Sequence, residues 1–115
     1  MRILLVSDDD PFAERVIALA ASRGVGISRA HREDDLELMA IRHGANIVAL
    51  DTNDALRRTA RAATAFAGLH PQIAVVLVSS GATAATFSGL PLVDKWWTPE
   101  RLLLELERAQ RELAG

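Results

Sequence analysis

Several polar residues of this chain come within three residues of the end of a short apolar run, at places where strands of a sheet would end. They are Asp8, Asp9, Asp51, Ser79 and Lys95. Clustered carboxylates suit a hard cation such as Mg²⁺, which prefers oxygen ligands. A carboxylate can also attack phosphorus, while a hydroxyl and an ammonium group stabilise the developing charge. Taken singly, each residue is more often a helix cap or a solvated side chain, so the hypothesis requires a fold that brings all five together.

The intervening pattern predicts such a fold. Strands are indicated over residues 3–6, 25–30, 46–51, 73–78 and 90–93, and helices over 11–23, 33–43, 54–68 and from 99 onward. Apolar runs this short are typical of parallel strands buried on both faces. Strand and helix alternate with short loops, which predicts a single domain over 1–115, an α/β fold with a doubly wound, five-stranded parallel sheet. Ligands of such sheets bind at the carboxyl ends of the strands.

Two stretches make the pattern less regular. Residues 82–89 are small, threonine-rich and weakly periodic, so they predict at most a short or irregular fourth helix. Pro91 interrupts the fifth strand, which suits an edge position.

The helix caps are also predicted from the sequence. Asp10 is interpreted as the N-cap of the first helix and Pro11 as its first helical residue, and Thr98 is interpreted as the cap of the last helix.

Composition narrows the class of protein. The net charge of −2 gives no electrostatic reason to expect direct binding to nucleic acid. Cysteine is absent from the sequence, which excludes disulfides and thiolate chemistry and fits a cytoplasmic protein. No apolar run approaches the length of a membrane span, so we expect no membrane partner.

The order of the motifs resembles a receiver domain of a two-component response regulator, whose fold is the flavodoxin-like (βα)5. Residues 3–11 (ILLVSDDDP) resemble its first strand and acidic cluster, and 48–51 (VALD) its third strand and phosphoacceptor. Residues 76–80 (VLVSS) resemble its fourth strand and hydroxyl residue, and 94–103 (DKWWTPERLL) its lysine and final helix. The resemblance covers nearly the whole chain.

The resemblance implies roles for individual residues. Asp51 would accept a phosphoryl group from a histidine kinase or phosphotransfer protein. Asp8 and Asp9 would hold Mg²⁺ together with Asp51 and the main-chain carbonyl of Asn53. Ser79 and Lys95 would neutralise the phosphoryl group. The protein would then not be an enzyme beyond slow self-catalysed phosphoryl transfer and autodephosphorylation. Its partners would be the kinase and a downstream protein target, and a homodimer is compatible with the resemblance.

The acidic cluster departs from the pattern because it has one residue more than usual. Counting back from Pro11 makes Asp8 and Asp9 the metal pair, whereas counting forward from Val6 makes it Ser7 and Asp8. We prefer the first count, because Ser7 can simply extend the strand.

The output region departs as well. Leu92 replaces the switch aromatic, and Trp96 replaces the proline after the lysine. A cis bond before Trp96 would cost about 3 kcal/mol, so we expect a trans bond. We predict an unusual partner surface that includes Leu92, Trp96 and Trp97, although Trp97 also suits the core and Trp96 could cover its own surface.

Two other functions remain open. A pseudo-receiver, which binds partners without phosphorylation, is favoured by the missing aromatic and the short fourth segment. A metal-dependent phosphohydrolase is suggested by the Asp8-x-Asp10 pattern after a strand, but the chain is short for a cap domain and lacks a downstream acidic pair.

Overall fold

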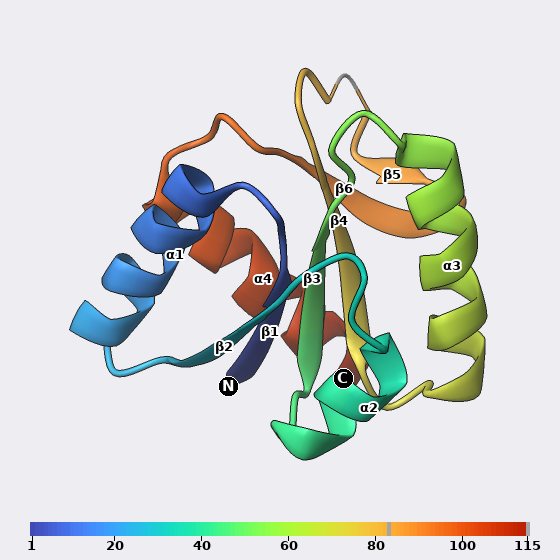
Figure 1. The fold of residues 1–115 in the computed structure, drawn as a ribbon, viewed down its shortest axis with the longest axis horizontal. Coiled ribbons are helices and arrows are strands. Elements are labelled where there is room, and N and C mark those ends of the chain that lie inside the picture. Colours follow the sequence, from blue (N-terminus) through green and yellow to red (C-terminus); the bar gives the residue numbers. More distant parts are fainter. Residues whose placement is uncertain (83, 115) are drawn as a thin grey trace.

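A computed structural model describes residues 1–82 and 84–114 of the chain. Figure 1 shows a central sheet with helices on both faces, as predicted. The strands are β1 (Arg2–Val6), β2 (Gly26–Ala30), β3 (Ile47–Asp51), β4 (Ala74–Ser79), β5 (Thr86–Phe87) and β6 (Leu90–Asp94). The helices are α1 (Asp10–Ser22), α2 (Leu36–Arg42), α3 (Leu56–Leu69) and α4 (Pro99–Ala114). The strand order is β2-β1-β3-β4-β6-β5.

Successive side chains of each central strand enter two separate apolar clusters. In β3, Ile47 and Ala49 pack in the cluster that α1 and α4 cover, and Val48 and Leu50 pack in the cluster that α2 and α3 cover. All five residues of β3 are buried. This two-sided burial explains why the strand is apolar throughout, and it leaves Asp51 as the one charged residue of β3, at its carboxyl end.

The segment after β4 forms a β-hairpin, whereas the sequence predicted at most a short or irregular helix there. Apart from residue 83, which lies outside the described residues, this segment holds the short strand β5, which pairs antiparallel with β6. Ser88 and Gly89 form the turn, with φ of 53° and 79°. Two residues with positive φ make the tight turn typical of β-hairpins. The sheet therefore has a sixth strand, and β5 rather than the Pro91-containing β6 is the edge.

The starts of α1 and α2 differ from the prediction for reasons of capping, and α3 begins two residues later than predicted, at Leu56. Asp9, rather than Asp10, is the N-cap of α1, and its Oδ1 accepts a hydrogen bond from the amide of Phe12 at 3.1 Å. The second helix begins later than predicted because the Asp34 side chain accepts a hydrogen bond from the His31 amide, and Asp35 then caps α2. The Thr98 Oγ1 accepts from the Arg101 amide at 3.3 Å, as its predicted capping role requires.

Candidate functional site at the carboxyl edge of the sheet

Asp51 lies at the carboxyl end of β3 and is almost completely buried, with 2% of its surface exposed. The chain turns sharply beyond it, because Asn53 and Asp54 both have positive φ, of 43° and 66°. The amide of Asn53 donates to Asp51 Oδ1 at 3.2 Å. The turn therefore directs the Asn53 amide at the carboxylate before α3 begins.

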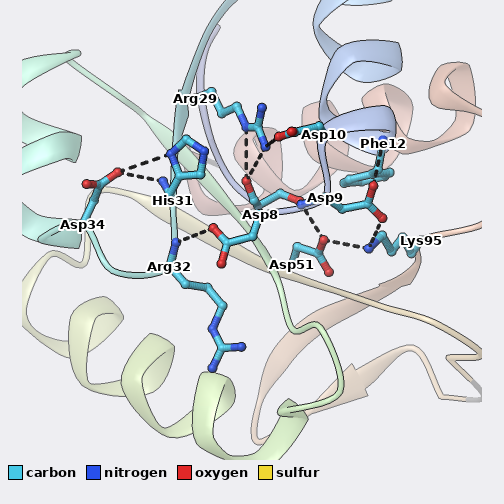
Figure 2. Close-up of polar contacts among 11 residues, drawn as sticks. Asp8, Asp9, Asp10, Phe12, Arg29, His31, Arg32, Asp34, Asp51 and Lys95 are labelled. Atoms are coloured by element: carbon cyan, nitrogen blue, oxygen red, sulfur yellow. Dashed lines mark hydrogen bonds and ion pairs between the residues drawn. The ribbon is translucent and has the colours of Figure 1, made fainter.

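Lys95 is the partner that balances the charge of Asp51. Its Nζ lies 2.8 Å from Asp51 Oδ2 and 2.8 Å from Asp9 Oδ2 (Figure 2). The lysine side chain is only 6% exposed, and its amide donates to the carbonyl of Ser79 at 3.0 Å, which fixes the start of the loop after β6. A buried ammonium group is tolerated only when it is paired, and here two carboxylates pair with it.

The ion pairs change the acidity of both partners. The hydrogen bond from Lys95, and then that from the Phe12 amide, holds the pKa of Asp9 below its ordinary value. Burial by itself would lower the pKa of Lys95, but its hydrogen bonds to Asp51 and Asp9 outweigh burial and raise that pKa. Lys95 is therefore positively charged at neutral pH, and Asp9 is negatively charged.

Ser7 belongs to this network, although we predicted that it only extends the first strand. Its amide does extend the pairing, donating to Ala30 O at 3.0 Å. Its side chain, however, is buried, and Ser7 Oγ donates to Asp51 Oδ2 at 2.7 Å and accepts from the Asp9 amide at 3.1 Å. Counting forward from Val6 had placed Ser7, together with Asp8, at the position of the metal pair. We call Ser7, Asp9, Asp51 and Lys95 the Asp51 network.

Asp8 is not brought into the Asp51 network. It is exposed, and its Oδ1 accepts from the amide of Arg32 at 3.1 Å (Figure 2). Asp10 likewise turns outward and pairs with Arg29 at 2.6 Å. Among residues 1–82 and 84–114, no three acidic or histidine side chains lie close enough to hold a metal ion together. This arrangement does not support the phosphohydrolase reading, which needs Asp8 and Asp10 at one site.

The predicted partner surface is only partly exposed. Leu92 is 6% exposed and packs in the cluster under α2 and α3, so its assignment to a surface was wrong. Trp97 is half-buried against the core, with the Arg101 guanidinium 3.8 Å from its ring centre. Trp96 is 64% exposed, and the bond that joins it to Lys95 is trans, as expected. Of the three residues, only Trp96 is free to act as an anchor for a partner.

Sequence comparisons and structure comparisons give different results. No family model and no curated protein matches the chain. Its structure is similar to NtrX from Brucella abortus in complex with ADP, with a TM-score of 0.80 and 22% identity over 99% of this chain and 27% of NtrX. It is also similar to a CheY-like receiver domain protein from Methanospirillum hungatei JF-1, with a TM-score of 0.76 and 18% identity over 98% of this chain and 95% of that protein.

A third similar structure is that of an atypical orphan response regulator, reported to reveal a phosphorylation-independent regulatory mechanism. Its TM-score is 0.77 at 17% identity, covering 96% of each chain. At such low identities, the likeness establishes the fold. The chain has the fold of response regulator receiver domains, as its motifs predicted. In the described part of the chain, no helix is long and apolar enough to span a membrane.

Proposed function

We propose that this chain is a receiver module that accepts a phosphoryl group on Asp51 from a histidine kinase or phosphotransfer protein. The observation that carries the proposal is the buried contact between Asp51 and Lys95, 2.8 Å at the carboxyl edge of the sheet, in a chain with the receiver fold. A carboxylate nucleophile and a fixed ammonium group are the two parts that phosphoryl transfer to an aspartate most needs.

In the proposed reaction, a carboxylate oxygen of Asp51 forms a bond to phosphorus while the bond from phosphorus to the donor imidazole nitrogen breaks. Lys95 then neutralises charge on the phosphoryl oxygens, and the Ser79 hydroxyl, at the end of the neighbouring strand β4, donates to them. Ser7 and Asn53 hold the Asp51 carboxylate in one orientation through their hydrogen bonds. A nucleophile fixed in this way loses little conformational freedom when it reacts.

The residues present fit Mg²⁺ with two carboxylates rather than three. Asp9 and Asp51 converge on the same lysine nitrogen, so these two carboxylates would hold the ion, and the family resemblance implies the main-chain carbonyl of Asn53 as a third ligand. Mg²⁺ commonly keeps several waters and uses only one or two carboxylates together with phosphate oxygens. When bound, the ion would neutralise phosphoryl oxygens. Asp8 stays outside this ligand set because it bonds to the Arg32 amide.

Tryptophan fluorescence can test the proposal, because the Trp96 ring centre lies 5.9 Å from Lys95 Nζ. We expect a saturable change when beryllofluoride, an aspartyl-phosphate mimic, is added with Mg²⁺. Asp51→Asn should abolish the change, and intact-mass analysis after acetyl phosphate treatment should find the added phosphoryl group only in the wild type. Ser7→Asp adds a third carboxylate and should lower the Mg²⁺ concentration needed for half-saturation.

A second candidate function is an interaction module that works without phosphorylation. The outward position of Asp8 favours it, together with the presence of Ser7 where a third carboxylate would strengthen metal binding. One protein of similar structure is itself reported to act through a phosphorylation-independent mechanism. A silent beryllofluoride titration and no mass change in the wild type would overturn the first proposal. The same result would favour this second one, with exposed Trp96 as a candidate anchor.

A further inference from the structure

A cavity of about 290 Å³ opens between α2 and α3, beside the carboxyl ends of β1 and β3. β1 and β3 are neighbours in the sheet, and the chain continues from β1 to β2 on one side and from β3 to β4 on the other. Open α/β sheets bind ligands at such a topological switch point. The walls are apolar side chains from three strands and from the start of α2, namely Val6, Ala30, Leu50 and Leu36. Asp51 also lines the cavity, so the cavity adjoins the Asp51 network.

Two arginines from different elements line the same cavity. Arg32 follows β2 and Arg58 lies in the first turn of α3. Within residues 1–82 and 84–114, neither guanidinium forms an ion pair with a carboxylate. In Figure 2 the Arg32 amide contacts Asp8, whereas its side chain extends away from Asp8.

The acidic residues of the cavity, by contrast, already have partners. Asp34 Oδ2 accepts from the His31 amide at 2.7 Å and lies 3.9 Å from the His31 ring. Asp51 is paired with Lys95 and accepts two further hydrogen bonds, from Ser7 and Asn53. The charges left to interact with a ligand are therefore the two guanidinium groups, and an anion is the charge that they complement.

We propose that the cavity binds a small organic anion with an apolar body. Its carboxylate would lie between Arg32 and Arg58, and its apolar part would contact Val6, Leu36 and Leu50. The volume is near the lower limit of ligand pockets, which restricts the ligand to roughly the size of two fused rings. The proposal does not depend on phosphorylation of Asp51.

The test is a titration of ¹⁵N-labelled protein with 2-naphthoate, followed by amide NMR shifts. We expect saturable shifts in residues 30–36 and 58–62, the segments that line the cavity. The neutral analogue 2-naphthalenemethanol should bind about tenfold more weakly, because it loses a charge-assisted contact. Equal affinity for the two compounds, or no saturable shift in these segments, would overturn the proposal.

Matched variants locate the site. Arg32→Gln and Arg58→Gln should each weaken 2-naphthoate binding about tenfold. Arg61→Gln should not, because Arg61 lies on the same helix but lines a different depression, beside Phe87. Ala62→Phe should block the cavity, whereas Ala65→Phe, on that other side, should not. An equal loss in Arg58→Gln and Arg61→Gln would indicate non-specific attraction and would contradict the proposal. The titration contains neither a phosphoryl donor nor Mg²⁺, so its result does not depend on whether Asp51 is phosphorylated.

Discussion

At the scale of single residues, the Asp51 network is a problem of buried charge. Two carboxylates, one of them 1% exposed, share one ammonium group that is 6% exposed. The Ser7 hydroxyl and two backbone amides, of Asn53 and Phe12, also donate hydrogen bonds to these carboxylates. Removing the lysine would leave buried carboxylate without its cation, a change that commonly costs about 3–5 kcal/mol.

The shifted pKa values predict how stability depends on pH. The lowered pKa of Asp9 stabilises the fold above its unfolded value of about 3.9, and this contribution is lost as pH falls through the lower folded value. The raised pKa of Lys95 stabilises the fold below about 10.4, and this contribution is lost as pH rises through the higher folded value. Urea unfolding of wild type and Asp9→Asn, between pH 2 and 7, measures the acid limb.

Asp9→Asn is a suitable variant because asparagine can still accept the hydrogen bond that caps α1. The free energy of unfolding of the variant should lie below that of the wild type at neutral pH. The two values should converge as the solution is acidified below about pH 4. A difference that stays constant over this range would show that the charge of Asp9 does not stabilise the fold.

The sequence predicted much of the candidate site but not its arrangement. Asp9, Asp51 and Lys95 were correctly expected to meet, because carboxyl ends of parallel strands share one edge. The extra residue in the acidic cluster made the register of Asp8 and Ser7 ambiguous. Spacing alone does not decide that ambiguity, because the orientation of each side chain depends on where the strand pairing ends and the helix cap begins.

At the scale of elements, α3 begins in a way that opposes its own stability. Its N-cap is Ala55, which offers no side-chain hydrogen bond, and its first turn has no acidic residue. Arg57 and Arg58 stand in that turn, and Arg61 follows one turn later. The positive end of the helix dipole favours carboxylates there, and like charges four residues apart repel.

Arg57→Glu should therefore stabilise the protein by about 0.5–1 kcal/mol, because a carboxylate there suits the helix dipole and can pair with Arg61. Scanning calorimetry should find a melting temperature higher by about 2–4 °C. The matched control is Arg111→Glu in the last turn of α4, where the same charge change opposes the dipole and should lower the melting temperature. Equal shifts in both variants would contradict the electrostatic explanation.

The hairpin shows where element prediction failed. The family resemblance favoured some helix between β4 and β6, whereas the local sequence Phe87-Ser88-Gly89-Leu90 carries a turn signal between two apolar residues. The turn chemistry determined the structure, since Ser88 and Gly89 both adopt positive φ. Phe87 packs against the cluster under α2 and α3, so an aromatic side chain covers apolar surface that the missing helix leaves.

At the scale of the whole molecule, the topology followed from the buried strands, but stability should be uneven across the sheet. β3 is central and pairs with both β1 and β4. β6 pairs with β4 through only Leu77–Leu92, Val78–Val93 and Ser79–Asp94, and β5 contributes two residues. The edge formed by β5 and β6 should therefore open without unfolding the centre.

Native-state hydrogen exchange can measure this difference. The amides of Ala49 in β3 and Val76 in β4 should exchange only through global unfolding, because both residues are completely buried. The amide of Leu92, which donates to Ala85 O at 2.9 Å, should exchange with a smaller opening free energy and little dependence on denaturant. Equal opening free energies at the centre and at the edge would mean that the domain opens as one unit.

The sequence separation within the Asp51 network has a consequence for folding kinetics. Ser7 follows β1, Asp51 ends β3, and Lys95 follows β6. The contacts among them therefore form only after the long chain segments between these strands have closed. Closing such loops costs entropy before the contacts form. The network should therefore be absent from the folding transition state. Its loss would speed unfolding and leave the folding rate nearly unchanged, which makes these four side chains a determinant of the lifetime of the native state.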